Sequence, residues 1–173
     1  MSGKQLGLAA ARRTVLIVGE GLAEAHFLAH CKRLFLSRSA GISVTIQDAR
    51  GKGAANVISH AIKQKARTNF DDYFALFDAD TDWTDKLKKE AKTKNIQVLL
   101  AQLCLEALLL DIHSQPTQGK NTKQLKTQFE SFFGAVASTE SLYAKRFDKN
   151  TLNLAAQRIA LLQSILTIFQ SSK

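Results

Sequence analysis

The chain has 173 residues, of which 45% are hydrophobic, and it carries a formal net charge of +9. This length fits one domain with a substantial core, and no stretch approaches the roughly 18 apolar residues that a membrane span requires. Arg12 and Arg13 interrupt the short apolar run that precedes them, so the sequence predicts no signal peptide. Cys31 and Cys104 are too few for a disulfide framework. They favour reduced, packed thiols in a cytoplasmic protein.

The excess of positive charge favours a polyanionic partner, although it also helps solubility. Residues 114–173 carry eight Lys and Arg against three Asp and Glu, whereas residues 1–113 carry sixteen against twelve. Residues 1–12 are interpreted as a basic N-terminal arm. Any acidic site in the first part of the chain would therefore lie within a largely basic surface, as expected if the substrate is a phosphate.

Strand-like and helix-like segments alternate along residues 13–113. The apolar runs and alternating patterns predict strands at 15–18, 42–46, 73–77 and 96–101, and helices at 23–35, 54–66, 84–94 and 103–113. Thr84 is a plausible N-cap for the third of these helices. Such alternation predicts an α/β domain with a parallel sheet of about four strands and flanking helices.

The pattern changes after Ser114. A polar turn region at 114–122 is followed by helical patterns at 122–133, 141–147 and 152–169. The last of these has a wide apolar face that includes Leu154, Ile159 and Leu162. Residues 114–173 are therefore expected to form a helical C-terminal extension that packs on the same domain.

Two groups of carboxylates follow predicted strands. Glu20 and Glu24 come after the first strand, and Asp78, Asp80 and Asp82 come after the third. Ligands of open α/β sheets bind at the carboxyl ends of the strands, and acids that converge there repel one another unless a cation lies between them. An oxygen-rich set without a Cys/His cluster favours Mg²⁺ or Mn²⁺ over zinc. Glu24 and Asp82 also suit a helix start, so for them a capping role is the alternative.

Glu106 lies in a helical segment that is apolar on most sides. A carboxylate in such a place should be protonated, paired or metal-bound, and His113 is seven residues further on the same face. The alternative is a polar stripe that reaches solvent. Arg50 and Lys52 flank a glycine-rich loop without the P-loop spacing, interpreted as a basic loop that touches backbone phosphates. Lys52 or a C-terminal lysine such as Lys123 is expected at the rim of the site.

The sequence Val15–Gly21 followed by Glu24, a βα unit, and then Phe77-Asp78-Ala79-Asp80 resembles the TOPRIM domain of topoisomerases, bacterial primases, OLD nucleases and small ribonucleases. The compact Glu-Gly-x-x-Glu, the pair Arg12-Arg13 and the segment Cys104–His113 are most similar to RloB-like proteins. Where those proteins usually have Asn-Pro, this chain has Gln102-Leu103. The resemblance implies that Glu20 is the catalytic acid/base, that Asp78 and Asp80 are Mg²⁺ ligands, and that Glu24 and Glu106 are additional metal-site acids.

These observations predict a Mg²⁺- or Mn²⁺-dependent nuclease-like protein that hydrolyses a phosphodiester of DNA or RNA. RloB-like proteins occur in bacterial defence loci, so the resemblance implies defence against foreign DNA. One alternative is a non-catalytic nucleic-acid-binding or partner-regulated TOPRIM module. Another is a small RNA-processing or primase-like enzyme. The expected partner is nucleic acid and not a membrane, and the resemblance leaves a partner ATPase and a homodimer open.

Overall fold

The computed structural model describes residues 13–79 and 82–170, which form one parallel sheet and eight helices. The strands are β1 (Arg13–Gly19), β2 (Ile42–Asp48), β3 (Asp72–Asp78) and β4 (Ile96–Ala101). The helices are α1 (Leu22–Phe35), α2 (Gly53–Arg67), α3 (Asp85–Thr93), α4 (Leu105–Ile112), α5 (Thr122–Phe133), α6 (Glu140–Arg146), α7 (Lys149–Ala156) and α8 (Ala160–Gln170). The predicted α/β class with a four-stranded parallel sheet is confirmed. The predicted basic arm, 1–12, lies outside the described residues.

The strands are parallel throughout and follow the order β2-β1-β3-β4. The chain moves from β1 to β2 on one side and then crosses to β3 and β4 on the other side. The carboxyl ends of β1 and β3 are therefore neighbours at the point where the order reverses, which is the usual ligand crevice of such sheets. No helix in the described part of the chain is both long and apolar enough to cross a membrane.

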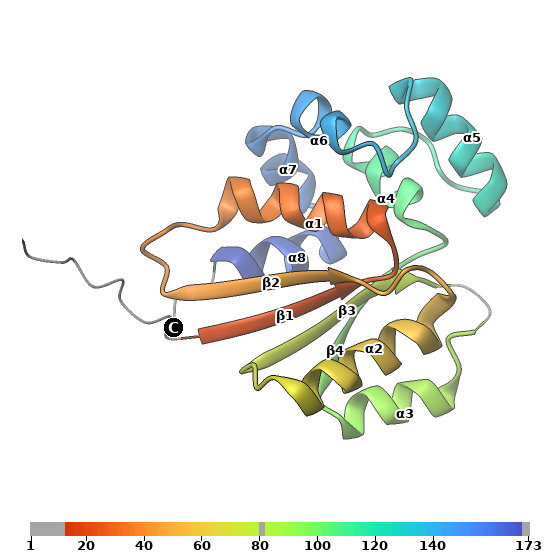
Figure 1. Ribbon diagram of the computed structural model, residues 1–173. Helices are drawn as coiled ribbons and strands as arrows, with labels where there is room; N and C mark the ends of the chain where they lie inside the picture. Colours follow the sequence, from red (N-terminus) through yellow and green to blue (C-terminus); the bar gives the residue numbers. More distant parts are fainter. Residues whose placement is uncertain (1–12, 80–81, 171–173) are drawn as a thin grey trace, which may run out of the picture.

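Helices cover both faces of the sheet, so its central strands are apolar on both sides. Val15 and Ile17 belong to the core that includes α1, α8 and the other C-terminal helices, whereas Leu16 and Val18 belong to the core beneath α2 and α3. All four side chains are fully buried. In Figure 1 α1 and α8 lie on one side of the sheet, α2 and α3 lie on the other, and α4 to α7 form a further group beyond α1.

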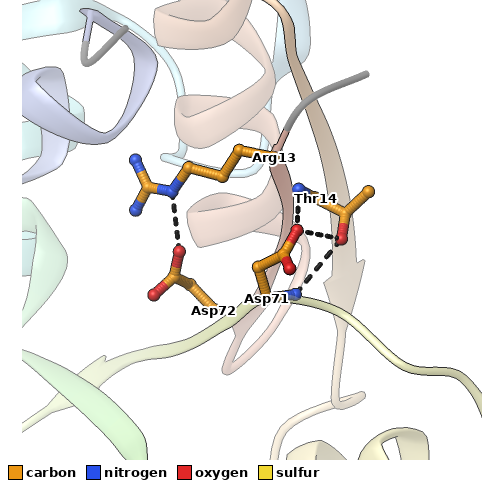
Figure 2. Close-up of polar contacts among 4 residues, drawn as sticks. All are labelled: Arg13, Thr14, Asp71 and Asp72. Carbon is orange, nitrogen blue, oxygen red and sulfur yellow. Dashed lines mark hydrogen bonds and ion pairs between the residues drawn. The ribbon is translucent and has the colours of Figure 1, made fainter. Parts of the chain in front are cut away.

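The amino ends of β1 and β3 are joined by polar side chains (Figure 2). Arg13 Nε donates to Asp72 Oδ2 at 2.7 Å, in an ion pair whose side chains are 18% and 28% exposed. Thr14 donates from its backbone N–H and its hydroxyl to Asp71 Oδ2, at 2.6 and 2.8 Å. The second arginine of the Arg12-Arg13 pair therefore has a structural partner, at the end of the sheet opposite Glu20 and Asp78.

The C-terminal helices share a core with the sheet. The buried hydroxyl of Tyr143 donates to the carbonyls of Ala137 at 2.6 Å and Ala23 at 3.3 Å. His30 Nε2 contacts the Phe147 carbonyl at 2.6 Å, and this buried contact ties α1 to the end of α6. Helix α8 contacts both α1 and β4. One continuous apolar cluster thus extends from the sheet into the C-terminal part of the chain.

The prediction of a single helix over 152–169 is wrong, because the chain turns at residues 157–159 between α7 and α8. Arg158 in this turn donates to Asp111 Oδ1 at 2.5 Å and also to the Asp111 carbonyl. Helix α7 packs against α4, whereas α8 packs against the sheet. Leu154, which was placed on the apolar face, is 56% exposed, while Ile159 and Leu162 are buried as predicted.

Leu162 in α8 tests whether the sheet and the C-terminal helices unfold together. Its side chain is fully buried, so Leu162→Ala should lower the free energy of unfolding by about 2–5 kcal/mol. Trp83 lies on the other face of the sheet, against Phe77. Its fluorescence and the helical circular dichroism should therefore report the same lowered midpoint in urea. The exposed neighbour substitution Gln163→Ala is the control, and two separate transitions would contradict a shared core.

Candidate functional site

Glu20 connects three segments at the carboxyl edge of the sheet. It follows β1, and its backbone N–H continues the sheet by donating to the Leu76 carbonyl at 2.9 Å. Its carboxylate accepts from the N–H of Asp78 at 3.3 Å through Oε2, and from the N–H of Gly53 at 3.2 Å through Oε1. The end of β1, the end of β3 and the start of α2 therefore meet at this one side chain.

Glu24 lies beside this position because α1 begins directly after Glu20. A Cβ at Gly19 would lie 2.8 Å from the Glu24 Cβ, so only glycine lets the first turn of α1 approach the strand end so closely. Glu24 Oε2 accepts from the Gly21 N–H at 2.9 Å and so caps its own helix. The residue is only 8% exposed. Glu24 therefore caps α1, as the alternative interpretation expects, and it is also buried beside the other acids.

Asp78, the last residue of β3, and Asp82, which follows it, also bind the starts of helices. Asp78 Oδ1 accepts from the Leu105 N–H at 2.9 Å, at the first residue of α4. Asp82 accepts from the N–H groups of Ala54 and Ala55, both at 3.0 Å, at the start of α2. Asp82 therefore caps α2, while Thr84 caps α3 as predicted. Asp80, the second predicted Mg²⁺ ligand, lies outside the described residues.

Glu106 faces the same group from α4 and has a side chain that is 14% exposed. Its ionic partner is Lys126 of α5, whose Nζ lies 4.0 Å from Glu106 Oε1. His113, which the sequence offers as one partner, is instead packed among Phe132, Phe133 and Phe147. Of the predicted states of Glu106 (protonated, paired or metal-bound), the structure shows the paired one, with a partner from a helix more distant in the sequence.

The predicted basic loop wraps around Glu20. Arg50, Gly51, Lys52 and Gly53 all have positive φ angles, between 62° and 75°. The Gly51 N–H donates to the Glu20 carbonyl at 2.7 Å, and the side-chain amide of Asn56 donates to the Ala49 and Gly51 carbonyls. These bonds hold a backbone that is costly for the two non-glycine residues. They leave the side chains of Arg50 and Lys52 exposed beside the site.

Burial and the charges of neighbouring acids raise the proton affinity of two carboxylates of the site, Asp78 and Glu24. Burial, the largest cause, and the charges of Glu24, Glu20 and Glu106 together raise the pKa of Asp78 to about 8, although the charge of Lys126 lowers it. Burial likewise raises the pKa of Glu24, with additions from Glu20 and Glu106. The four carboxylates Glu20, Glu24, Asp78 and Glu106 therefore act electrostatically as one group, which we call the acidic cluster.

The donor atoms of the acidic cluster are oxygens, which suit Mg²⁺ or Mn²⁺. Within the described residues, the Asp78 carboxylate makes its side-chain hydrogen bond through Oδ1. Within 13–79 and 82–170, however, no three Asp, Glu, His or Cys side chains already form a group that could hold a metal ion. In the arrangement described, backbone amides occupy both oxygens of Glu20 and one oxygen of Asp78.

Two features of the site were not predicted from the sequence. Lys126 approaches the acidic cluster, whereas the predicted Lys123 lies exposed one turn earlier on α5. Their i, i+3 spacing puts both on neighbouring positions of a helix surface, but nothing in the sequence indicates that α5 packs on α4. The contact of Asp82 with α2 was also missed, because it joins residues 27 and 28 positions apart.

Comparisons of the chain with protein-family models, with curated proteins and with solved structures found no match. The resemblance to TOPRIM and RloB-like proteins rests on the sequence motifs and stays a prediction.

The raised pKa of Asp78 predicts how stability depends on pH without divalent cations. The folded protein holds this proton up to about pH 8, whereas the ordinary carboxyl value is 3.8. The folded state thus binds more protons between these values, and the free energy of unfolding should fall as pH rises through this window, by at most about 1.4 kcal/mol per pH unit. Above about pH 8 the dependence should level off.

Urea unfolding in EDTA at several pH values measures this dependence. Asp78→Asn removes the titrating group, so the variant should lose stability less steeply than the wild type between pH 5 and pH 8. Asp85→Asn, whose side chain is 89% exposed, is the control for loss of one carboxylate. Parallel curves for the wild type and Asp78→Asn would contradict the burial of an ionisable Asp78 in a repelling cluster.

Proposed function

We propose that this protein is a nuclease that requires Mg²⁺ or Mn²⁺ and hydrolyses a phosphodiester of DNA or RNA at the acidic cluster. The observation that carries the proposal is the position of Glu20. Its carboxylate bonds to the backbone of Asp78 and of Gly53, which draws acids from β1 and β3 into the crevice of the sheet. Glu24 and Glu106 add their charges from α1 and α4.

The cost of this arrangement supports a role in binding a cation. Four carboxylates that are partly or largely removed from water destabilise one another when all are ionised. The hydrogen bonds from helix N-termini offset only part of that cost. Selection for folding alone would remove such repulsion, for example by amide substitutions that preserve the caps. A site that binds a divalent cation needs the charges.

Different residues of the site would bind the cation, transfer the proton and contact the substrate phosphates. Asp78 would hold the cation together with Glu24 or Glu106, and with Asp80 as the resemblance implies. A bound Mg²⁺ supplies polarisation of the phosphoryl oxygen and a more acidic water. Glu20, oriented by two amide groups, would accept or return a proton at the attacking or leaving oxygen. Arg50 and Lys52, exposed on the adjoining loop, would contact flanking phosphates.

The order of strand, Glu-Gly-x-x-Glu, βα unit and Asp-x-Asp also supports the proposal that the chain is a TOPRIM protein of the RloB-like type. The parallel sheet with β1 beside β3 is compatible with it. Cleavage of foreign nucleic acid in bacterial defence is the biological role that this resemblance implies.

Glu20→Gln tests the proposed catalytic acid/base. Labelled DNA and RNA should be cut by the wild type in Mg²⁺ or Mn²⁺ and remain intact in EDTA. Glu20→Gln keeps an acceptor for one of the two amides but cannot transfer the proton, so the cleavage rate should fall roughly 100-fold to 10,000-fold. Gel assays under single-turnover conditions measure it. Asp85→Asn should cleave like the wild type, because Asp85 is exposed on α3.

One result would contradict the role of Glu20, and another would contradict the nuclease activity itself. Glu20→Gln with the wild-type rate would remove Glu20 from the chemistry. A pure wild-type protein that binds nucleic acid but cuts none with any metal would favour the non-catalytic module instead.

A further inference from the structure

Lys126 is the residue through which the C-terminal helices reach the acidic cluster. It lies on α5, its Nζ is 4.0 Å from Glu106 Oε1, and its charge also acts on Asp78. The other acids of the cluster come from β1, α1 and β3. Among the described ion pairs, this one alone involves an acid of the cluster.

Helix α5 holds Lys126 in this position through a fixed first turn. Asn121 and Gln124 form a capping box, with side chain to backbone hydrogen bonds of 3.0 and 2.9 Å. Leu125 and Phe129 on the same helix are fully buried. Lys120 is tied to Gln128 Oε1 at 2.5 Å and to the Pro116 carbonyl at 3.0 Å. The backbone of Lys126 is therefore well anchored beside α4.

The ammonium group of Lys126 is only loosely held by Glu106. At 4.0 Å the contact with Glu106 is an ion pair without a hydrogen bond, and half of the Lys126 side chain is exposed. Lys120 by contrast is committed to two acceptors. Lys123 makes no ion pair with a described residue and lies one turn away. Lys126 is thus a cation that is held close to the cluster but can turn toward an incoming anion.

We propose that Lys126 binds a non-bridging phosphate oxygen of the nucleic acid at the acidic cluster, so that the C-terminal helices complete the site. This inference rests on the proposed function, because it assumes that the cluster receives a phosphodiester. A cluster of carboxylates repels phosphate, and an ammonium group at its edge offsets this repulsion where the substrate must approach. Each phosphate contact of this kind releases a counterion and makes binding depend on salt.

The test compares binding of a fluorescein-labelled single-stranded oligonucleotide by wild type, Lys126→Gln, Lys126→Arg and Lys89→Gln. Anisotropy is measured over a series of salt concentrations with Ca²⁺ in place of Mg²⁺, and the integrity of the probe is checked on a gel. Lys126→Gln should reduce the slope of log K against log salt by about 0.7, the loss of one contact to single-stranded nucleic acid. Lys126→Arg should keep the wild-type slope. Lys89→Gln removes the same charge from an exposed position of α3 and should also keep it.

The outcomes separate this inference from the proposed hydrolysis. A reduced slope for Lys126→Gln alone supports it even if the wild type cuts nothing. Equal slopes for Lys126→Gln and wild type, or equal losses for Lys126→Gln and Lys89→Gln, would overturn it even if the wild type is an active nuclease, and Lys126 would then be only the counterion of Glu106. A wild type that does not bind the single-stranded probe would overturn this inference, whereas the proposed hydrolysis is decided by the cleavage assay. If Lys126→Gln is too unstable to measure, the double variant Lys126→Gln/Glu106→Gln leaves no unpaired carboxylate, and its slope compared with that of Glu106→Gln decides the question.

Discussion

Glu20 accepts hydrogen bonds from the amide of Gly53 at the start of α2 and from the amide of Asp78 at the end of β3. At the carboxyl edge of the sheet these two bonds join the end of β1 to α2 and β3. At the amino edge, the contacts of Arg13 and Thr14 join β1 to the start of β3. β1 is thereby fixed to β3 at both ends. The arrangement of every other acid in the crevice depends on this, because Glu24 follows Glu20 on α1 and Asp78 in turn binds the start of α4.

The same carboxylates have two opposed effects on the protein. Helices α1, α2 and α4 all begin at this edge, and their N-terminal amides stabilise nearby negative charge. Burial and mutual repulsion destabilise it, and for Asp78 they prevail, since its pKa is raised to about 8. A divalent cation would remove the repulsion and leave the capping bonds in place. The fold thus brings the carboxylates together at a cost in stability that a bound cation would remove.

The sequence predicted the sheet well because its signals are local. Apolar runs and alternation located all four strands, and the bounds of β4 and α5 match those expected. The ends of strands also located Glu20 and Asp78 correctly. Contacts between distant segments were not predictable in the same way. The turn between α7 and α8 contains neither Gly nor Pro, and the apolar spacing continues through it. Likewise, the pairing of Glu106 with Lys126 and not with His113 depends on how α5 packs on α4.

The proposed chemistry requires that Asp78 is a partly buried carboxyl whose proton competes with a divalent cation. Carbon-13 NMR of protein labelled at the aspartate carboxyl groups measures this directly, with Asp78→Asn to assign the signal. We expect Asp78 to titrate with a pKa of about 8 in EDTA, and Mg²⁺ to move this titration to lower pH. A carboxyl signal for Asp78 that titrates near its ordinary value of 3.8, and that Mg²⁺ leaves unchanged, would contradict it.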